Sequence, residues 1–102
     1  MKVLIKPLVR ERLDEFYEAA MKCHITLSED TVLAKKERLI DSLSTLETMQ
    51  GFPLSRCNDV WQQKGWHDFL CEDFHFAYEL AQDEEGNDVV VVQDAVHSLL
   101  YH

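Results

Sequence analysis

The stretch Asp73-Phe-His-Phe-Ala-Tyr-Glu-Leu80 decides the fold, because its apolar and polar side chains alternate with the period of a β-strand. The two sets are expected on opposite faces, with Phe74, Phe76, Tyr78 and Leu80 on one face and Asp73, His75, Ala77 and Glu79 on the other. A strand with this alternation predicts an antiparallel sheet that has one face on a core and the other face open.

The residues on either side of this strand extend it into an antiparallel meander. Residues 66–71 predict a preceding strand, and residues 83–88 form an acidic turn in which Gly86 and Asn87 tolerate a positive φ. Residues 89–96 are rich in valine, which is typical of a central strand buried on both faces. Three consecutive strands joined by short turns are therefore expected.

The N-terminal half predicts a strand and two helices. Residues 3–5 suit a short strand, and residues 8–23 carry apolar side chains at helical spacing. Ser28 is expected to cap a second helix, whose apolar stripe continues to Met49 and stops at residues 51–53, which include a glycine and a proline.

The expected fold class is α+β, with an N-terminal strand, a two-helix hairpin and an antiparallel meander that the helices cover on one face. Residues 51–65 lack a clear period and are expected to form an ordered loop. One shared core is predicted, made of Leu13, Phe16, Tyr17, Ala20, Ile40, Leu43, Leu46, Phe74, Phe76, Tyr78, Val90 and Val92.

Length and composition predict a single domain over residues 1–102, with an expected cytoplasmic location. No run approaches the roughly 18 apolar residues of a membrane span, and the first seven residues do not resemble a signal peptide. The three cysteines are widely spaced and include no Cys-x-x-Cys pair, which argues for a reducing compartment and against a structural zinc site. No cofactor or metal is expected, although His75, His97, His102 and Cys71 leave an unspecific transition-metal site as an open alternative.

The net charge of the chain indicates which class of molecule it can bind. Nineteen acidic residues against ten basic ones give a formal net charge of −9. Nucleic-acid binders usually gain most of their affinity by neutralising phosphates with basic residues, so this charge argues against free nucleic-acid binding. A basic protein segment is the more natural partner of an acidic domain.

Two segments near the C-terminus resemble a known family. The strand at residues 73–80 and the ending His97-Ser-Leu-Leu-Tyr101 are similar to the RelE/ParE-type toxin superfamily of plasmid-stabilisation toxins, and the ending is similar to its YafQ-like branch. The expected order of elements matches that family over nearly the whole chain. The resemblance implies a toxin-like component of a toxin–antitoxin module, with a cognate antitoxin as partner and ribosome-bound mRNA or DNA gyrase as target.

The resemblance also implies site residues. Asp73 matches an acidic residue ahead of the strand's aromatic residue, and His97 and Tyr101 match the C-terminal histidine and aromatic residue. His75 falls near the position of a phosphate-stabilising arginine in other branches, and His67 is a candidate for an upstream histidine, although its spacing to Asp73 differs. This chain departs from the family in being strongly acidic.

Cleavage of RNA by 2′-OH attack needs a base, an acid and positive charge near the phosphate. Histidine suits either proton-transfer role, so His97 could work with His67 or His75 while Asp73 orients an imidazole and Tyr101 stacks on a base. Arg56 and Lys64 are the only cations after Met49, which leaves the charge-stabilising role poorly filled.

Each candidate also has a structural interpretation, as a strand-end histidine, a turn cap or a packed tyrosine. Three functions therefore stay open: an endoribonuclease, a non-catalytic protein-binding relative, and an orphan domain without toxicity. We expect the candidates to share one shallow concavity on the open face of the sheet. Replacing His97 or Tyr101 there should abolish activity with little effect on stability.

Overall fold

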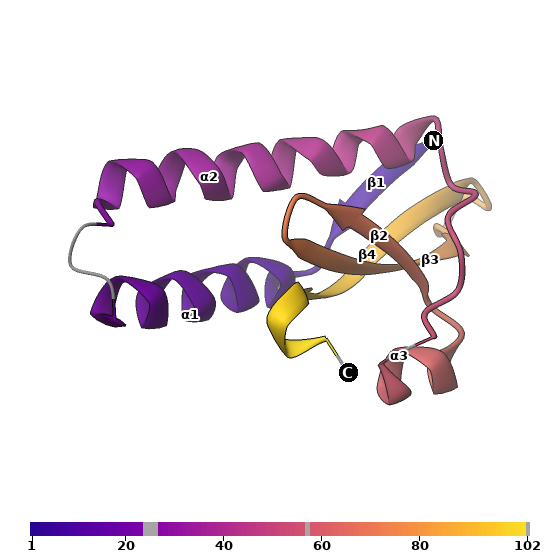
Figure 1. Cartoon of the computed structure of the whole chain (residues 1–102). Helices are drawn as coiled ribbons and strands as arrows, with labels where there is room; N and C mark the ends of the chain where they lie inside the picture. Colours follow the sequence, from indigo (N-terminus) through magenta and orange to yellow (C-terminus); the bar gives the residue numbers. More distant parts are fainter. Residues whose placement is uncertain (24–26, 57, 102) are drawn as a thin grey trace.

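The computed structural model describes residues 1–23, 27–56 and 58–101 and has an α+β fold. A four-stranded mixed sheet has the order β1-β4-β3-β2, in which β1 runs parallel to β4 and the other neighbours are antiparallel (Figure 1). Its strands are β1 (Lys2–Ile5), β2 (His67–Cys71), β3 (Phe74–Gln82) and β4 (Asp88–His97). The predicted meander and its central valine strand are confirmed.

Two long helices, α1 (Pro7–Cys23) and α2 (Glu29–Ser42), run side by side as a hairpin (Figure 1). The Ser28 side chain caps α2 by accepting a hydrogen bond from the Thr31 N–H, as expected. The apolar stripe of the second helix does not stay α-helical to Met49, because α2 ends at Ser42 and continues as a 3₁₀ turn, η1 (Leu43–Glu47).

The segment expected to be a loop contains a short helix, α3 (Asp59–Lys64). Asn58 caps its start through a hydrogen bond from the Trp61 N–H, and Gly65 ends it with a φ of +70°. The capping residues at both ends are visible in the sequence, but six residues are too few to show the spacing of apolar side chains that identifies a helix. A last 3₁₀ turn, η2 (Ser98–Leu100), follows β4.

The core lies between the helix hairpin and one face of the sheet. The predicted core residues belong to this cluster or pack against it, apart from Ala20, which is half-buried. Phe76 is fully buried between its neighbours Phe74 and Tyr78, so the register predicted for β3 is confirmed.

A β-bulge in β4 changes which of its side chains face the helices. Tyr78 pairs with Val92, whereas the preceding Ala77 pairs with Asp94, so Gln93 is an extra residue with no partner in β3. Val92 before the bulge lies on the helix-covered face. After the bulge, residues 95 and 97 lie on that same face, opposite Phe76 and Phe74.

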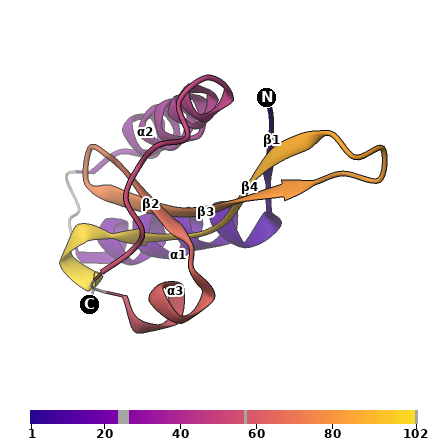
Figure 2. The same ribbon diagram turned by 90° about the vertical axis from the view of Figure 1, so that its right-hand side faces the viewer.

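α3 and the C-terminal turn cover part of the opposite face of the sheet, which corrects the prediction of an open face. Leu70 of β2, on the same face as His75, stays 56% exposed. Figure 2 shows α2 and α3 on opposite sides of the sheet. Trp61 of α3 is buried, and its ring lies 5.7 Å from the ring of Tyr101, which in turn stacks on His75 of β3. As a result Ala77, on this face, is fully buried. Within the described part of the chain, no helix has the length and apolar character needed to cross a bilayer.

Candidate functional site

The five predicted site residues lie in three places and not in one concavity. Asp73 and His97 meet on the helix-covered side of the sheet, and His75 and Tyr101 meet on the opposite face. His67 lies apart, where its Nδ1 is 2.7 Å from the Phe52 carbonyl oxygen and its ring stacks on Tyr78. The bulge at Gln93 accounts for the separation of His97 from His75, because without it residue 97 would point to the same face as His75.

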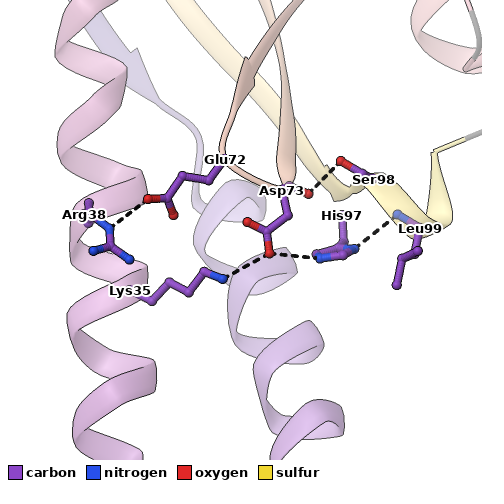
Figure 3. A network of polar contacts seen from close by, with 7 residues as sticks. All are labelled: Lys35, Arg38, Glu72, Asp73, His97, Ser98 and Leu99. Atoms are coloured by element: carbon purple, nitrogen blue, oxygen red, sulfur yellow. Dashed lines mark hydrogen bonds and ion pairs between the residues drawn. The ribbon is translucent and has the colours of Figure 1, made fainter.

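The first group, the Asp73 cluster, is made of Lys35, Asp73 and His97 (Figure 3). Asp73 stands in the tight turn between β2 and β3, His97 is the last residue of β4, and Lys35 comes from α2. The Asp73 Oδ2 accepts hydrogen bonds from Lys35 Nζ at 3.0 Å and from His97 Nε2 at 3.3 Å. The predicted role of Asp73 in orienting an imidazole therefore has a geometric basis.

The hydrogen bonds of His97 define its tautomer. The Leu99 N–H donates to His97 Nδ1 at 3.1 Å, so the proton of the neutral ring lies on Nε2 and is donated to Asp73. The ring also stacks on Phe16 of α1, with 4.1 Å between centroids and 9° between planes, and the residue is only 9% exposed. Both ring nitrogens and one ring face are thus occupied within the chain.

The electrostatics of this cluster are nearly balanced. Partial burial would raise the pKa of the Asp73 carboxyl, but the hydrogen bonds and charge of Lys35, together with His97, outweigh burial and hold the pKa below its ordinary value. The hydrogen bond to Asp73 likewise raises the pKa of Lys35. Beside them Arg38 pairs with Glu72 at 3.0 Å, so two cations meet two carboxylates.

The turn that carries Asp73 is backbone-strained. Glu72 has a φ of +54°, which is uncommon for a residue other than glycine, and Cys71 pairs with Phe74 on either side of it. The Arg38 ion pair and the Lys35 contact to Asp73 hold this turn against α2 (Figure 3). Close by, burial raises the pKa of the Tyr17 hydroxyl, and the neighbouring Lys35 partly offsets this rise.

The second group, the Asp68 cluster, is made of Ser55, Asp68, His75 and Tyr101. Asp68 lies 2.9 Å from His75 Nδ1 and accepts a hydrogen bond from the Tyr101 hydroxyl at 2.5 Å. The Tyr101 oxygen is also 2.7 Å from the hydroxyl of Ser55, which is buried. The Tyr101 ring stacks on the His75 ring, with 3.9 Å between the ring centroids. One face of Tyr101, which was expected to stack on a nucleobase, is therefore occupied by a side chain of the chain itself.

Sequence reasoning missed several residues that the structure brings to these places. Lys35 and Arg38 sit one helical turn apart on α2, and this spacing was the available signal for a shared cationic edge. Asp68 completes the second cluster. Asp94, next to the bulge, accepts hydrogen bonds from Arg12 Nε and Trp61 Nε1, both at 3.2 Å, and so ties α1 and α3 to β4.

A groove of about 500 Å³ opens between α1, α3 and the end of β4. Its lining includes apolar side chains from all three elements and from η2, together with Arg12, Glu15, Asp94 and His97. Neither Asp73 nor the Asp68 cluster lines it, and it meets the Asp73 cluster only through the His97 ring.

The described residues contain no group of three or more His, Cys, Asp and Glu side chains placed to hold a metal ion. His75 and His97, which the sequence left open as metal ligands together with Cys71 and His102, lie on opposite faces of the sheet. His102 lies outside the described residues.

Comparisons with protein families, with curated proteins and with solved structures find no match to this chain.

Proposed function

We propose that the chain is a toxin-like domain of the RelE/ParE type that acts by binding a partner protein and not by cutting RNA. One observation carries the choice between these two activities. The candidate catalytic residues are divided between the two faces of the sheet, and their polar atoms are engaged by other residues of the chain.

General acid–base catalysis needs a ring nitrogen within reach of a substrate proton. In His97 both nitrogens are engaged, by Asp73 and by the Leu99 N–H, and its ring is covered by Phe16. In the Asp68 cluster, Tyr101 covers one face of the His75 ring. The nearby Lys35 and Arg38 are paired with carboxylates, so little positive charge is left for a phosphate.

RNA cleavage is the second candidate, and the Asp73–His97 pair favours it. A carboxylate that orients an imidazole, with a lysine on the same carboxylate, is a combination that proton transfer at a phosphate can use. This function requires the Leu99 N–H to leave His97 Nδ1, since a base must have a free nitrogen.

Controlled expression of the chain in bacteria tests the two candidates. Growth, total mRNA and DNA integrity would be followed with and without co-expression of a candidate antitoxin, meaning the product of any small adjoining gene (the neighbouring protein), and co-purification would measure binding. We expect a bound partner protein and unchanged mRNA levels. Rapid loss of mRNA that disappears in the Asp73→Asn variant would overturn this proposal in favour of the nuclease.

The same experiment covers the third possibility. If the chain neither slows growth nor binds the neighbouring protein or gyrase, it is an orphan domain and the proposal is wrong.

The matched control for Asp73→Asn is Asp83→Asn in the β3–β4 hairpin. Asp83 is a carboxylate that is hydrogen-bonded within its own turn and remote from both clusters.

A further inference from the structure

The groove between α1, α3 and η2 gathers apolar side chains that are far apart in the sequence. Phe16 and Ala19 come from α1, Val60 and Trp61 from α3, and Leu100 from η2. Val60 and Leu100 are 57% and 60% exposed, which is unusual for large aliphatic side chains that converge on one place. The groove therefore has an apolar floor, and Val60 and Leu100 form its exposed apolar lips.

The charges around this floor are predominantly acidic. Arg12 is the one cation among the described residues that line the groove, and it is already shared by Glu15 at 3.6 Å and Asp94 at 3.2 Å. Glu11 and Glu18 lie one turn on either side of Glu15 on α1, both are exposed, and neither forms an ion pair within the described part of the chain. With a formal net charge of −9 on the whole chain, the complementary occupant is basic.

The backbone at the floor limits how an occupant can bind. β1 pairs only with Val89–Val92, so no strand covers the outer edge of β4 after the bulge. Ala95 is nevertheless only 1% exposed, and its N–H donates to the side chain of Asp94. The Ala95 N–H is therefore not available to a partner strand, so we expect the occupant to bind through side chains, as an amphipathic helix does.

We propose that this groove binds an amphipathic helix of a partner protein, with its apolar face on Phe16, Val60 and Leu100 and with lysine or arginine beside the acidic stripe of α1. The inference rests on the proposed function, because it names where and by what chemistry the partner protein is held. The Asp68 cluster does not line the groove, whereas His97 of the Asp73 cluster does, so a bound helix would lie beside the His97 ring.

The test uses two synthetic helical peptides of about 16 residues with the same leucine pattern, one carrying lysine and the other glutamate at the polar positions. Binding to the full chain is measured by calorimetry and by NMR shifts of backbone amides. We expect the lysine peptide to bind at least roughly tenfold more tightly, to weaken as salt is added, and to shift the amides of α1, α3 and η2.

Val60→Lys places a charge on an exposed apolar lip and should weaken binding of the lysine peptide roughly tenfold or more. The matched control is Leu80→Lys on β3, which has a similar exposure of 51% and does not line the groove, and it should leave binding unchanged. Equal binding of both peptides, no binding of either, or unchanged binding to the Val60→Lys variant would overturn the inference.

Failure of the inference can be told apart from failure of the proposed function by repeating the measurement with the neighbouring protein. If that protein binds the Val60→Lys variant as tightly as the unmodified chain, the groove assignment is wrong while the proposed function stands. If no partner protein binds but the lysine peptide does so in a Val60-dependent way, the groove assignment stands and the proposed function fails.

Discussion

The two faces of the sheet each hold a carboxylate paired with an imidazole, yet the two pairs differ in what completes them. On the helix-covered face, Asp73 receives His97 together with the cation Lys35, and its side chain is 39% exposed. On the opposite face, Asp68 receives His75 together with the phenol of Tyr101, and its side chain is 14% exposed. The first pair is joined by the Lys35 cation near solvent, whereas the second is completed by the hydroxyl groups of Tyr101 and Ser55.

This difference shows that residue type alone does not assign a role. The five candidates were grouped because the sequence resemblance assigned them roles in proton transfer, phosphate stabilisation, imidazole orientation or base stacking. In the structure they lie beside different partners: Asp73 beside Lys35, Tyr101 beside Asp68, and His67 beside the Phe52 carbonyl. Each partner turns a chemically able side chain into a structural contact.

Replacing His97 tests whether the helix-covered pair is structural. Because the ring is buried against Phe16, His97→Ala should lower the free energy of unfolding by about 2 kcal/mol. His97→Phe keeps the stacking and loses only the two hydrogen bonds, so it should cost about half as much. This corrects the expectation that His97→Ala leaves stability unchanged. Equal losses in the two variants would argue that stacking on Phe16 contributes nothing.

The opposite face is tested by Tyr101→Phe, which keeps the ring over His75 and removes the hydroxyl between Asp68 and Ser55. A hydrogen bond to a carboxylate is lost, so the free energy of unfolding should fall by about 1.5 kcal/mol. The NMR signals of η2 should also broaden, because this hydroxyl ties the end of the chain to β2. Sharp η2 signals at full stability would show that the stack alone holds the C-terminal turn.

The smallest loss of stability is expected when the ion pair between Lys35 and Asp73 is removed. Lys35→Met should cost less than about 1 kcal/mol at neutral pH, since both partners are partly solvated. The pKa of Asp73 is lowered in the folded chain, so its contribution is present above the ordinary value of 3.8 and is lost as the pH falls through the lower folded value. The pKa of Lys35 is raised, so its contribution is lost only above the ordinary value of 10.5.

The difference in stability between the unmodified chain and the Lys35→Met variant should therefore be constant around neutrality and shrink in acid. Urea denaturation at neutral pH and at about pH 3 measures it. Lys6→Met is the control, because Lys6 is exposed and forms no ion pair within the described residues. A difference that grows in acid would show that Lys35 contributes through something other than Asp73.

The sequence by itself determined the elements and the core of this protein. Strand alternation predicted β3 and its buried face, helical spacing predicted α1, and Ser28 predicted the start of α2. These features are local, because propensity, periodicity and capping depend on neighbours a few residues apart. The short α3 was missed for the same reason, since its length is less than two helical turns.

Only the tertiary structure decided the site. A bulge adds one residue without a local signature, and that residue reverses the face of everything after it, which moved His97 away from His75. The contacts of Lys35 with Asp73 and of Tyr101 with Asp68 join residues more than thirty positions apart. Such contacts depend on how the helices and the chain end pack on the sheet, and no pattern of neighbouring residues records that packing.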